Sequence, residues 1–168
     1  APLPPADAAL WQRVEVELAL PQGALAAADR LSVLNGANAL AVEAAPGEWE
    51  ILQARDAMLT APGRLRIGHL LRGRRGTEHL AAAEIPAGAR VVVLDDAVTE
   101  LPLPADLRGL PRHYRVVPAG RDFFHAEAVH LEASTPGAGL RPFAPAHPAA
   151  RRLGDGGISL TWIRRTRS

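Results

Sequence analysis

Cysteine and lysine are both absent from this sequence of 168 residues. Without cysteine, the chain can form no disulfide, no thiolate-ligated zinc site and no cysteine-ligated iron–sulfur cluster. All 19 basic residues are arginine, so a phosphate-binding P-loop, which needs a lysine after its glycines, is excluded as well. We attribute the arginine bias to a GC-rich genome rather than to function.

Long apolar runs, net charge and aromatic side chains are also scarce. No apolar stretch approaches the roughly 20 residues that a membrane span requires, and the first ten residues lack the basic and apolar regions of a signal peptide. The formal net charge is only +1, which argues against a general nucleic-acid binder or membrane-surface binder. With three Trp, three Phe and one Tyr, the core is thin in large side chains but sufficient for one ordinary domain.

Short stretches in which apolar and polar residues alternate recur along the chain. A period of two is typical of strands with one buried face, and it appears in residues 11–20, 64–67 and 158–162. The run Val91-Val92-Val93-Leu94 is continuously apolar and predicts a strand covered on both faces. Further strand candidates are residues 48–52, 112–117 and 126–131.

Turn signals separate these strands, and helical signals are few. Asn35-Gly36 tolerates the positive φ angles of a tight turn, so residues 31–42 are predicted to form a hairpin. Short helical turns are expected only within residues 22–30 and 78–84. We therefore predict an all-β fold of mainly antiparallel strands, with one or two short helical turns and less than about 15% helix.

The distribution of proline suggests three parts. Residues 1–10 are interpreted as a linker, and residues 11–138 as a β-rich domain. Residues 139–168 begin with a stiff Pro-rich connector and end with one strand, which cannot bury its apolar face alone. We interpret this last part as the truncated start of a fibronectin type III-like sandwich. Since the first residue is not Met, we also expect the chain to be a piece of a longer polypeptide.

The most distinctive string is Arg72-Gly73-Arg74-Arg75-Gly76-Thr77-Glu78. Its two glycines permit backbone angles that other residues avoid, and Thr77 is expected to cap the short helix that follows. Arg72, Arg74 or Arg75 is expected to pair with an acidic residue of a neighbouring segment or subunit. We therefore interpret the string as a structural motif and an assembly contact; the alternative is a contact to an anion or a nucleic acid.

Residues that suggest catalysis or metal binding lack the required spacing. His125 and His130 are five positions apart, whereas two zinc ligands on one helix face stand four apart. On a strand the two imidazoles would point to opposite faces. Asp95-Asp96 are adjacent, so they cannot flank one glycosidic bond, and they are interpreted as a polar turn after a buried strand. No serine has a Gly-x-Ser-x-Gly setting. We expect no enzymatic activity, no cofactor and no metal, and we interpret Trp49 and Trp162 as core anchors.

Four strings occur in an order that resembles a known family. They are residues 47–53 (GEWEILQ), 70–78 (LLRGRRGTE), 140–145 (LRPFAP) and 160–167 (LTWIRRTR). Together they resemble the C-terminal part of the large tail-tip or baseplate protein of gene transfer agents and related siphophages, often labelled host-specificity protein or megatron. The resemblance covers roughly residues 31–168. Residues 1–30 match nothing in it.

The resemblance implies a structural role in a virion-like particle. It implies a β-rich hub at the distal end of the tail, assembled in the bacterial cytoplasm as a homotrimer, with fibronectin type III modules after the hub. Expected partners are the distal tail ring, other hub proteins and the host surface; sequence-specific nucleic-acid binding and a membrane span are not expected. The function implied is tail assembly together with host attachment or DNA delivery.

Two features of the family are missing here. Some relatives have a histidine after the Gly-Thr pair, where this chain has Ala81 to Glu84, and the cluster cysteines of some hub proteins are absent.

An alternative function is a carbohydrate-binding module for host glycans, which would require aromatic side chains exposed on one face. A fragment of a glycan hydrolase is a third option, but no convincing acid pair supports it.

Overall fold

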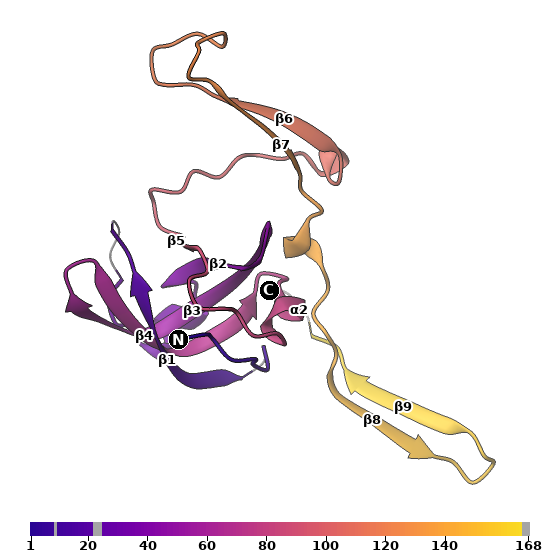
Figure 1. Ribbon diagram of the computed structural model, residues 1–168. Coiled ribbons are helices and arrows are strands. Elements are labelled where there is room, and N and C mark those ends of the chain that lie inside the picture. The colour runs from indigo at the N-terminus through magenta and orange to yellow at the C-terminus, as the bar shows by residue number, and fades with distance from the viewer. Residues whose placement is uncertain (9, 22–24, 166–168) are drawn as a thin grey trace. The chain divides into compact units, whose positions relative to one another are not determined.

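A computed structural model of the chain describes residues 1–8, 10–21 and 25–165. The described residues form an all-β fold, as predicted, with antiparallel strands and only short helices (Figure 1). The main sheet has five strands in the order β1-β4-β3-β2-β5. Their bounds are β1 Trp11–Ala19, β2 Ala39–Ala45, β3 Glu48–Ala61, β4 Arg64–Arg74 and β5 Val91–Val93.

The core lies against one face of this sheet. Alternation places Leu40 of β2, Leu52 of β3 and Leu70 of β4 on that face, and each is at most 1% exposed. The N-terminal segment adds to the core, because Leu3 is buried and pairs with Ile85 through two backbone hydrogen bonds of 2.9 Å. Residues 1–8, expected to be part of a linker, thus contribute to the core of the five-stranded sheet.

Residues 30–34 form helix α1 (Arg30–Leu34) rather than the first strand of a hairpin. Asp29 caps this helix, since its Oδ1 accepts hydrogen bonds from the backbone N–H groups of Leu31 (2.8 Å) and Ser32 (3.0 Å). The Ser32 hydroxyl, which donates to Oδ2 at 2.6 Å, is the main cause of the lowered pKa of Asp29. The predicted hairpin over residues 31–42 is therefore wrong, and Gly36, at φ 112°, lies in the turn after the helix.

Two other strand predictions need correction. Among the described residues, β5 pairs with β2 alone and forms an edge of the sheet. Val92 is 41% exposed, so the run is not covered on both faces. The strand expected at 126–131 is β7 (Val129–Ser134), because residues 126–127 form a turn.

A strand also lies where only a connector was expected. β8 (Ala146–Arg152) pairs with β9 (Ile158–Ile163), so β9 is not alone. Pro148 fits because the register shifts between Ala146 and Ala149, and proline is tolerated at such irregularities.

The chain divides into two compact units. The first comprises residues 1–99 and 139–168 and contains the five-stranded sheet, helix α2 (Glu78–Ala81) and the β8–β9 hairpin. The second comprises residues 100–138 and contains the 3₁₀ turn η1 (Ala105–Leu107), β6 (Pro111–Val116) and β7; a second 3₁₀ turn, η2 (Ala138–Leu140), lies at the boundary. Among the described residues, no helix is long and apolar enough to cross a membrane.

Candidate functional site

A buried ion pair lies at the centre of the distinctive string. Glu50 of β3 and Arg72 of β4 are both 0% exposed. The Arg72 Nε donates to Glu50 Oε1 at 2.9 Å, and Nη2 donates to Oε2 at 2.5 Å, which is a bidentate arrangement. The backbone N–H of Gly73 donates to the same Oε1 at 2.8 Å. The expectation that an arginine of the string pairs with an acid of a neighbouring segment is confirmed for Arg72.

The remaining donors of Arg72 reach two other segments. Nη1 donates to the carbonyl of Pro4, and Nη2 donates to the carbonyl of Ala83 at 3.2 Å. A buried guanidinium is tolerated only when such partners replace water. One side chain therefore joins β3, the N-terminal segment and the turn after α2. It also fixes the position of residues 73–77, which comprise the end of β4 and the turn after it and which we call the loop.

Three residues of this loop have left-handed backbone angles. Gly73 has φ 64° and Gly76 has φ 91°, which confirms the conformational role predicted for the two glycines. Arg75 has φ 53°, which is uncommon for a residue with a side chain. Space is also short at Gly73, where a Cβ atom would lie 2.7 Å from the Cα of Glu78 and 2.8 Å from the Cβ of Ala8.

Thr77 does not cap helix α2 with its side chain. Its hydroxyl donates to the Arg74 carbonyl at 2.7 Å and accepts from the Ile51 backbone N–H at 3.0 Å. The capping prediction is wrong because the hydroxyl is already used across the loop. These two bonds tie the loop to β3.

Glu78 connects the string to the last part of the chain. Its carboxylate accepts from Arg165 Nη2 at 2.6 Å and from the backbone N–H of Ala144 at 3.1 Å. The guanidinium of Arg165 lies over the Phe143 ring, 4.7 Å from its centroid. Sequence reasoning missed Arg165 and Phe143, because nothing in the local sequence shows that they meet residue 78.

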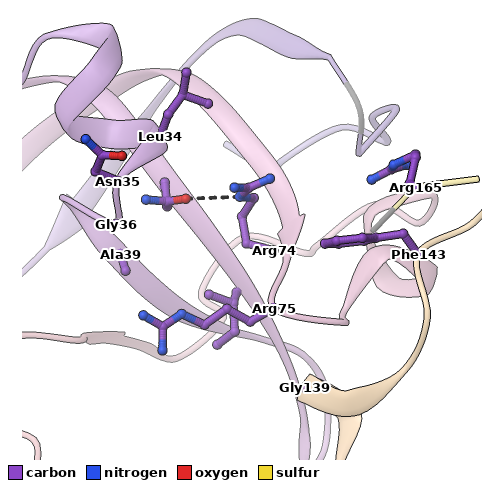
Figure 2. A pocket seen from close by; sticks show the side chains of 11 residues that line it. Leu34, Asn35, Gly36, Ala39, Arg74, Arg75, Gly139, Phe143 and Arg165 are labelled. Carbon is purple, nitrogen blue, oxygen red and sulfur yellow. Dashed lines mark hydrogen bonds between the residues drawn. The ribbon is translucent and has the colours of Figure 1, made fainter. Parts of the chain in front are cut away.

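An open groove of about 980 Å³ lies beside this loop (Figure 2). We call it the arginine groove, and it is lined by Leu34, Asn35, Gly36, Ala39, Ile51, Gln53, Arg74, Arg75, Gly139, Phe143 and Arg165. It combines three guanidinium groups with apolar wall residues, and the described lining contains no carboxylate.

The three arginines of the groove differ in how they are held. Arg74 Nε donates to the Gln53 Oε1 at 3.0 Å, and the buried Gln53 amide is fixed in turn by the carbonyls of Val33 and Ala37. Arg165 is neutralised by Glu78. In the part of the chain that the structure describes, exposed Arg75 has no hydrogen-bonded or charged partner. Arg74 and Arg75 therefore leave the groove with uncompensated positive charge.

The other residues singled out from the sequence lie apart from this groove. His130 Nε2 accepts from Arg115 Nε at 2.8 Å, and His125 Nδ1 accepts from the Glu127 backbone N–H at 3.2 Å. His125 lies before a turn and not on a strand, so the strand-based reason for its divergence from His130 does not apply. No group of three metal-ligating side chains occurs among the described residues.

The aspartate pair and the two tryptophans have structural settings. Asp95 Oδ1 accepts from the Ala97 backbone N–H at 3.0 Å, so the predicted polar turn is confirmed. Trp49 is half-buried under the Arg90 guanidinium, which lies 5.3 Å from its ring centroid. Trp162 is 59% exposed, so its prediction as a core anchor is wrong. Its ribbon has only two strands, and a two-stranded ribbon has no second layer to bury an aromatic ring.

One further polar cluster links β3 to β4. Asp56 accepts from Arg55 Nε at 2.8 Å and also contacts His69, whose backbone has φ 46°. The Arg55 guanidinium, and after it His69, lowers the pKa of Asp56 below its usual range. Both carboxylate oxygens are engaged, and we assign the cluster a structural role.

The fold and the loop define an antiparallel β-sheet module whose central strands are joined by a buried, fully hydrogen-bonded ion pair. A family model described as "Rcc01698-like, C-terminal" matches residues 1–92, which is more than half of the chain. The chain therefore belongs to the Rcc01698-like C-terminal family. The match includes the distinctive string of residues 72–78 and also residues 1–30, for which the resemblance offered nothing. A comparison with curated proteins found no match to the chain.

Proposed function

We propose that this chain is a non-enzymatic structural component of a phage-like tail tip or baseplate hub. Its family is associated with gene transfer agents, which supports a particle of this kind. The proposed role is tail assembly together with host attachment or DNA delivery. The chain would be assembled in the bacterial cytoplasm and reside in the tail of the particle.

The observation that carries this proposal is the exposure of two β-ribbons. None of the strands β6, β7, β8 and β9 contains a buried residue. On the β6–β7 ribbon, Val116 lies opposite Val129, and Tyr114 lies opposite Leu131, so one face is apolar. Val116, Val129 and Leu131 are each more than half exposed.

The β8–β9 ribbon repeats the pattern in the other unit. Ile158, Leu160 and Trp162 alternate along β9 and share one face, with exposures of 65%, 65% and 59%. Isolated two-stranded ribbons are at best marginally stable in water, and exposed apolar faces mark interaction surfaces. We infer that neighbouring subunits cover these faces in the assembled particle. The partners that fit are further copies in a homotrimer, the distal tail ring and other hub proteins.

A matched pair of substitutions on β9 tests the proposal. Leu160→Asp places a charge on the apolar face, whereas Thr161→Asp places the same charge on the opposite face. We expect the first variant to be missing from purified particles and the second to be incorporated, while both variants keep the circular dichroism spectrum of the wild type. Absence of the unmodified chain from the tail end of particles, tested by gold labelling, would refute the proposed function.

The exposure of Trp162 also favours one alternative, a carbohydrate-binding module. An exposed indole ring can stack on a sugar, and Phe124 is likewise 88% exposed. Binding of the chain to host-surface glycans on an array, lost in Trp162→Ala, would support this second function in place of the first.

A further inference from the structure

The arginine groove has the chemistry of a peptide-binding site that is unfilled within one copy of the chain. Arg74 and Arg75 supply positive charge without an acidic neighbour in the described lining, and Leu34, Ile51 and Phe143 supply apolar surface. Such a surface favours an extended segment that carries carboxylates next to apolar side chains. The formal net charge of only +1 argues against nucleic acid as the occupant.

One segment of this chain has the complementary composition. Residues 94–103, which we call the acidic segment, read LDDAVTELPL and contain three carboxylates and no basic residue. Residues 95–98 form a turn, and the stretch that follows has no helix or strand up to Pro104. Val98 is 42% exposed and Leu101 is 69% exposed, so apolar side chains are also available. Pro102, and Pro104 directly after the segment, restrict its backbone and lower the entropy cost of ordering it on binding.

The pairing between these two parts is not made within one chain. The segment starts next to the groove, because the Leu94 backbone N–H donates to the carbonyl of Ala39, a lining residue, at 2.9 Å. Nevertheless, neither Asp95 nor Asp96 forms an ion pair in the described part of the chain, and Asp95 instead accepts from Ala97. The positive charges of Arg74 and Arg75 and the negative charges of Asp95 and Asp96 can therefore form ion pairs with another molecule.

We propose that the arginine groove of one copy binds the acidic segment of a second copy. The carboxylates of Asp95 and Asp96 pair with Arg74 and Arg75, and the apolar side chains of the segment contact Leu34 and Phe143. This inference rests on the proposed function, because assembly into a hub places copies of the chain next to one another. It gives the distinctive string a binding role in addition to its structural one.

A synthetic peptide of residues 94–103 tests the site on the full chain. We expect the peptide to bind in fluorescence anisotropy, to bind about tenfold more weakly to Arg75→Gln, and to dissociate at high salt. The matched control is Arg66→Gln, an exposed arginine on β4 outside the groove, which should bind the peptide normally. A peptide with Asn, Asn and Gln at positions 95, 96 and 100 should not bind.

The proposed site is refuted if the peptide does not bind or if the peptide with Asn, Asn and Gln binds equally well. It is also refuted if Arg66→Gln weakens binding as much as Arg75→Gln does. Preferential displacement of the peptide by a single-stranded oligonucleotide would also overturn it, in favour of nucleic acid.

Charge exchange then identifies the source of the segment. One variant carries Arg74→Glu and Arg75→Glu, and the other carries Asp95→Arg and Asp96→Arg. We expect each variant alone to lose self-association in sedimentation, and an equal mixture of the two to regain it. If the wild-type chain is monomeric at all soluble concentrations, or the mixture stays monomeric, binding between copies is refuted. Neither outcome affects the location of the chain in particles, so the proposed function is tested separately.

Discussion

At the scale of single residues, the buried carboxylate of Glu50 has the largest energetic consequence. It neutralises Arg72, which has no access to water, and it also accepts from the backbone of Gly73. Glu50→Gln keeps the shape of the side chain but leaves the guanidinium without a counter-charge. We expect a loss of about 3–5 kcal/mol in the free energy of unfolding.

Urea denaturation measures this loss. Glu48→Gln is the matched control, since Glu48 is an exposed carboxylate on the same strand and should cost close to nothing. Equal free energies of unfolding for Glu50→Gln and Glu48→Gln would show that the ion pair of Glu50 and Arg72 does not stabilise the fold.

Gly73 is the second sensitive residue, for a steric reason. An added methyl group would have to shift the Glu78 backbone in addition to adopting a positive φ. Gly47 has a similar φ of 79° but open space around it. Gly47→Ala should therefore cost about 1 kcal/mol, and Gly73→Ala should cost clearly more, on the order of 2–4 kcal/mol when strain and overpacking add. Thermal melting of both variants compares them, and equal losses would contradict the steric argument.

Glu43 gives the chain a defined response to acid. Its hydrogen bonds from Arg90, and then from the Gly47 backbone, lower its pKa to about 2. A carboxyl group with a lowered pKa stabilises the fold above its unfolded-state value near 4.5 and loses this contribution as the pH falls toward 2. We expect Glu43→Gln to melt below the wild type at pH 7, and the difference in melting temperature to shrink as the pH falls from about 4.5 to about 2. A difference at pH 2 as large as the one at pH 7 would contradict this.

At the scale of elements, period-two alternation was a reliable guide to the strands. It located β1, β4 and β9, because apolar and polar side chains alternate along each of these strands. It could not show that the run of valines in β5 is an edge, since burial depends on which strands lie beside it. β8 was not predicted, because Pro148 indicated a connector rather than a strand.

Helix α1 shows how a local cap decides between two readings of the same residues. Asn35-Gly36 is typical of a hairpin turn. However, the Asp29 side chain accepts hydrogen bonds from two backbone N–H groups and caps a helix over the residues before that turn. Asp29→Ala should cost about 0.5–2 kcal/mol, the usual value of an N-cap. The control is Asp106→Ala, an exposed aspartate outside the acidic segment, which should have little effect by chemical denaturation. A loss for Asp106→Ala as large as that for Asp29→Ala would remove the case for a specific cap.

Part of the candidate site was also predictable at this scale. Glu50 shares a strand face with Leu52 and Ala54, and Arg72 shares one with Leu70, so two opposite charges stood on core-facing positions. This signal could have identified the pair. The groove could not be predicted, because Phe143 and Arg165 are far from Arg74 in sequence and no period connects them.

At the scale of the whole molecule, apolar burial is very uneven. The five-stranded sheet holds most of the buried side chains of the described residues, whereas the strands of both ribbons hold none. Hydrogen exchange in the free chain should therefore be slowest in β3 and β4 and fast in β6–β7 and β8–β9. In assembled particles we expect the ribbon amides to become protected. Ribbon amides that are as slow as those of β3 in the free chain would show that the ribbons need no partner.

The bonds of Arg72 also have a mechanical meaning. The guanidinium connects Pro4 near one end of the chain to Glu50, and its own strand continues directly into Arg74 and Arg75. Tension applied to the first residues would thus be shared between this hydrogen bond to Pro4 and the backbone hydrogen bonds of Leu3 with Ile85 and of Ala6 with Ala81. Detaching the N-terminal segment would leave a buried donor of Arg72 without an acceptor, which adds to the cost of pulling the segment away. If the chain resides in a tail as proposed, a load on its first residues would reach the groove loop through the ion pair between Arg72 and Glu50.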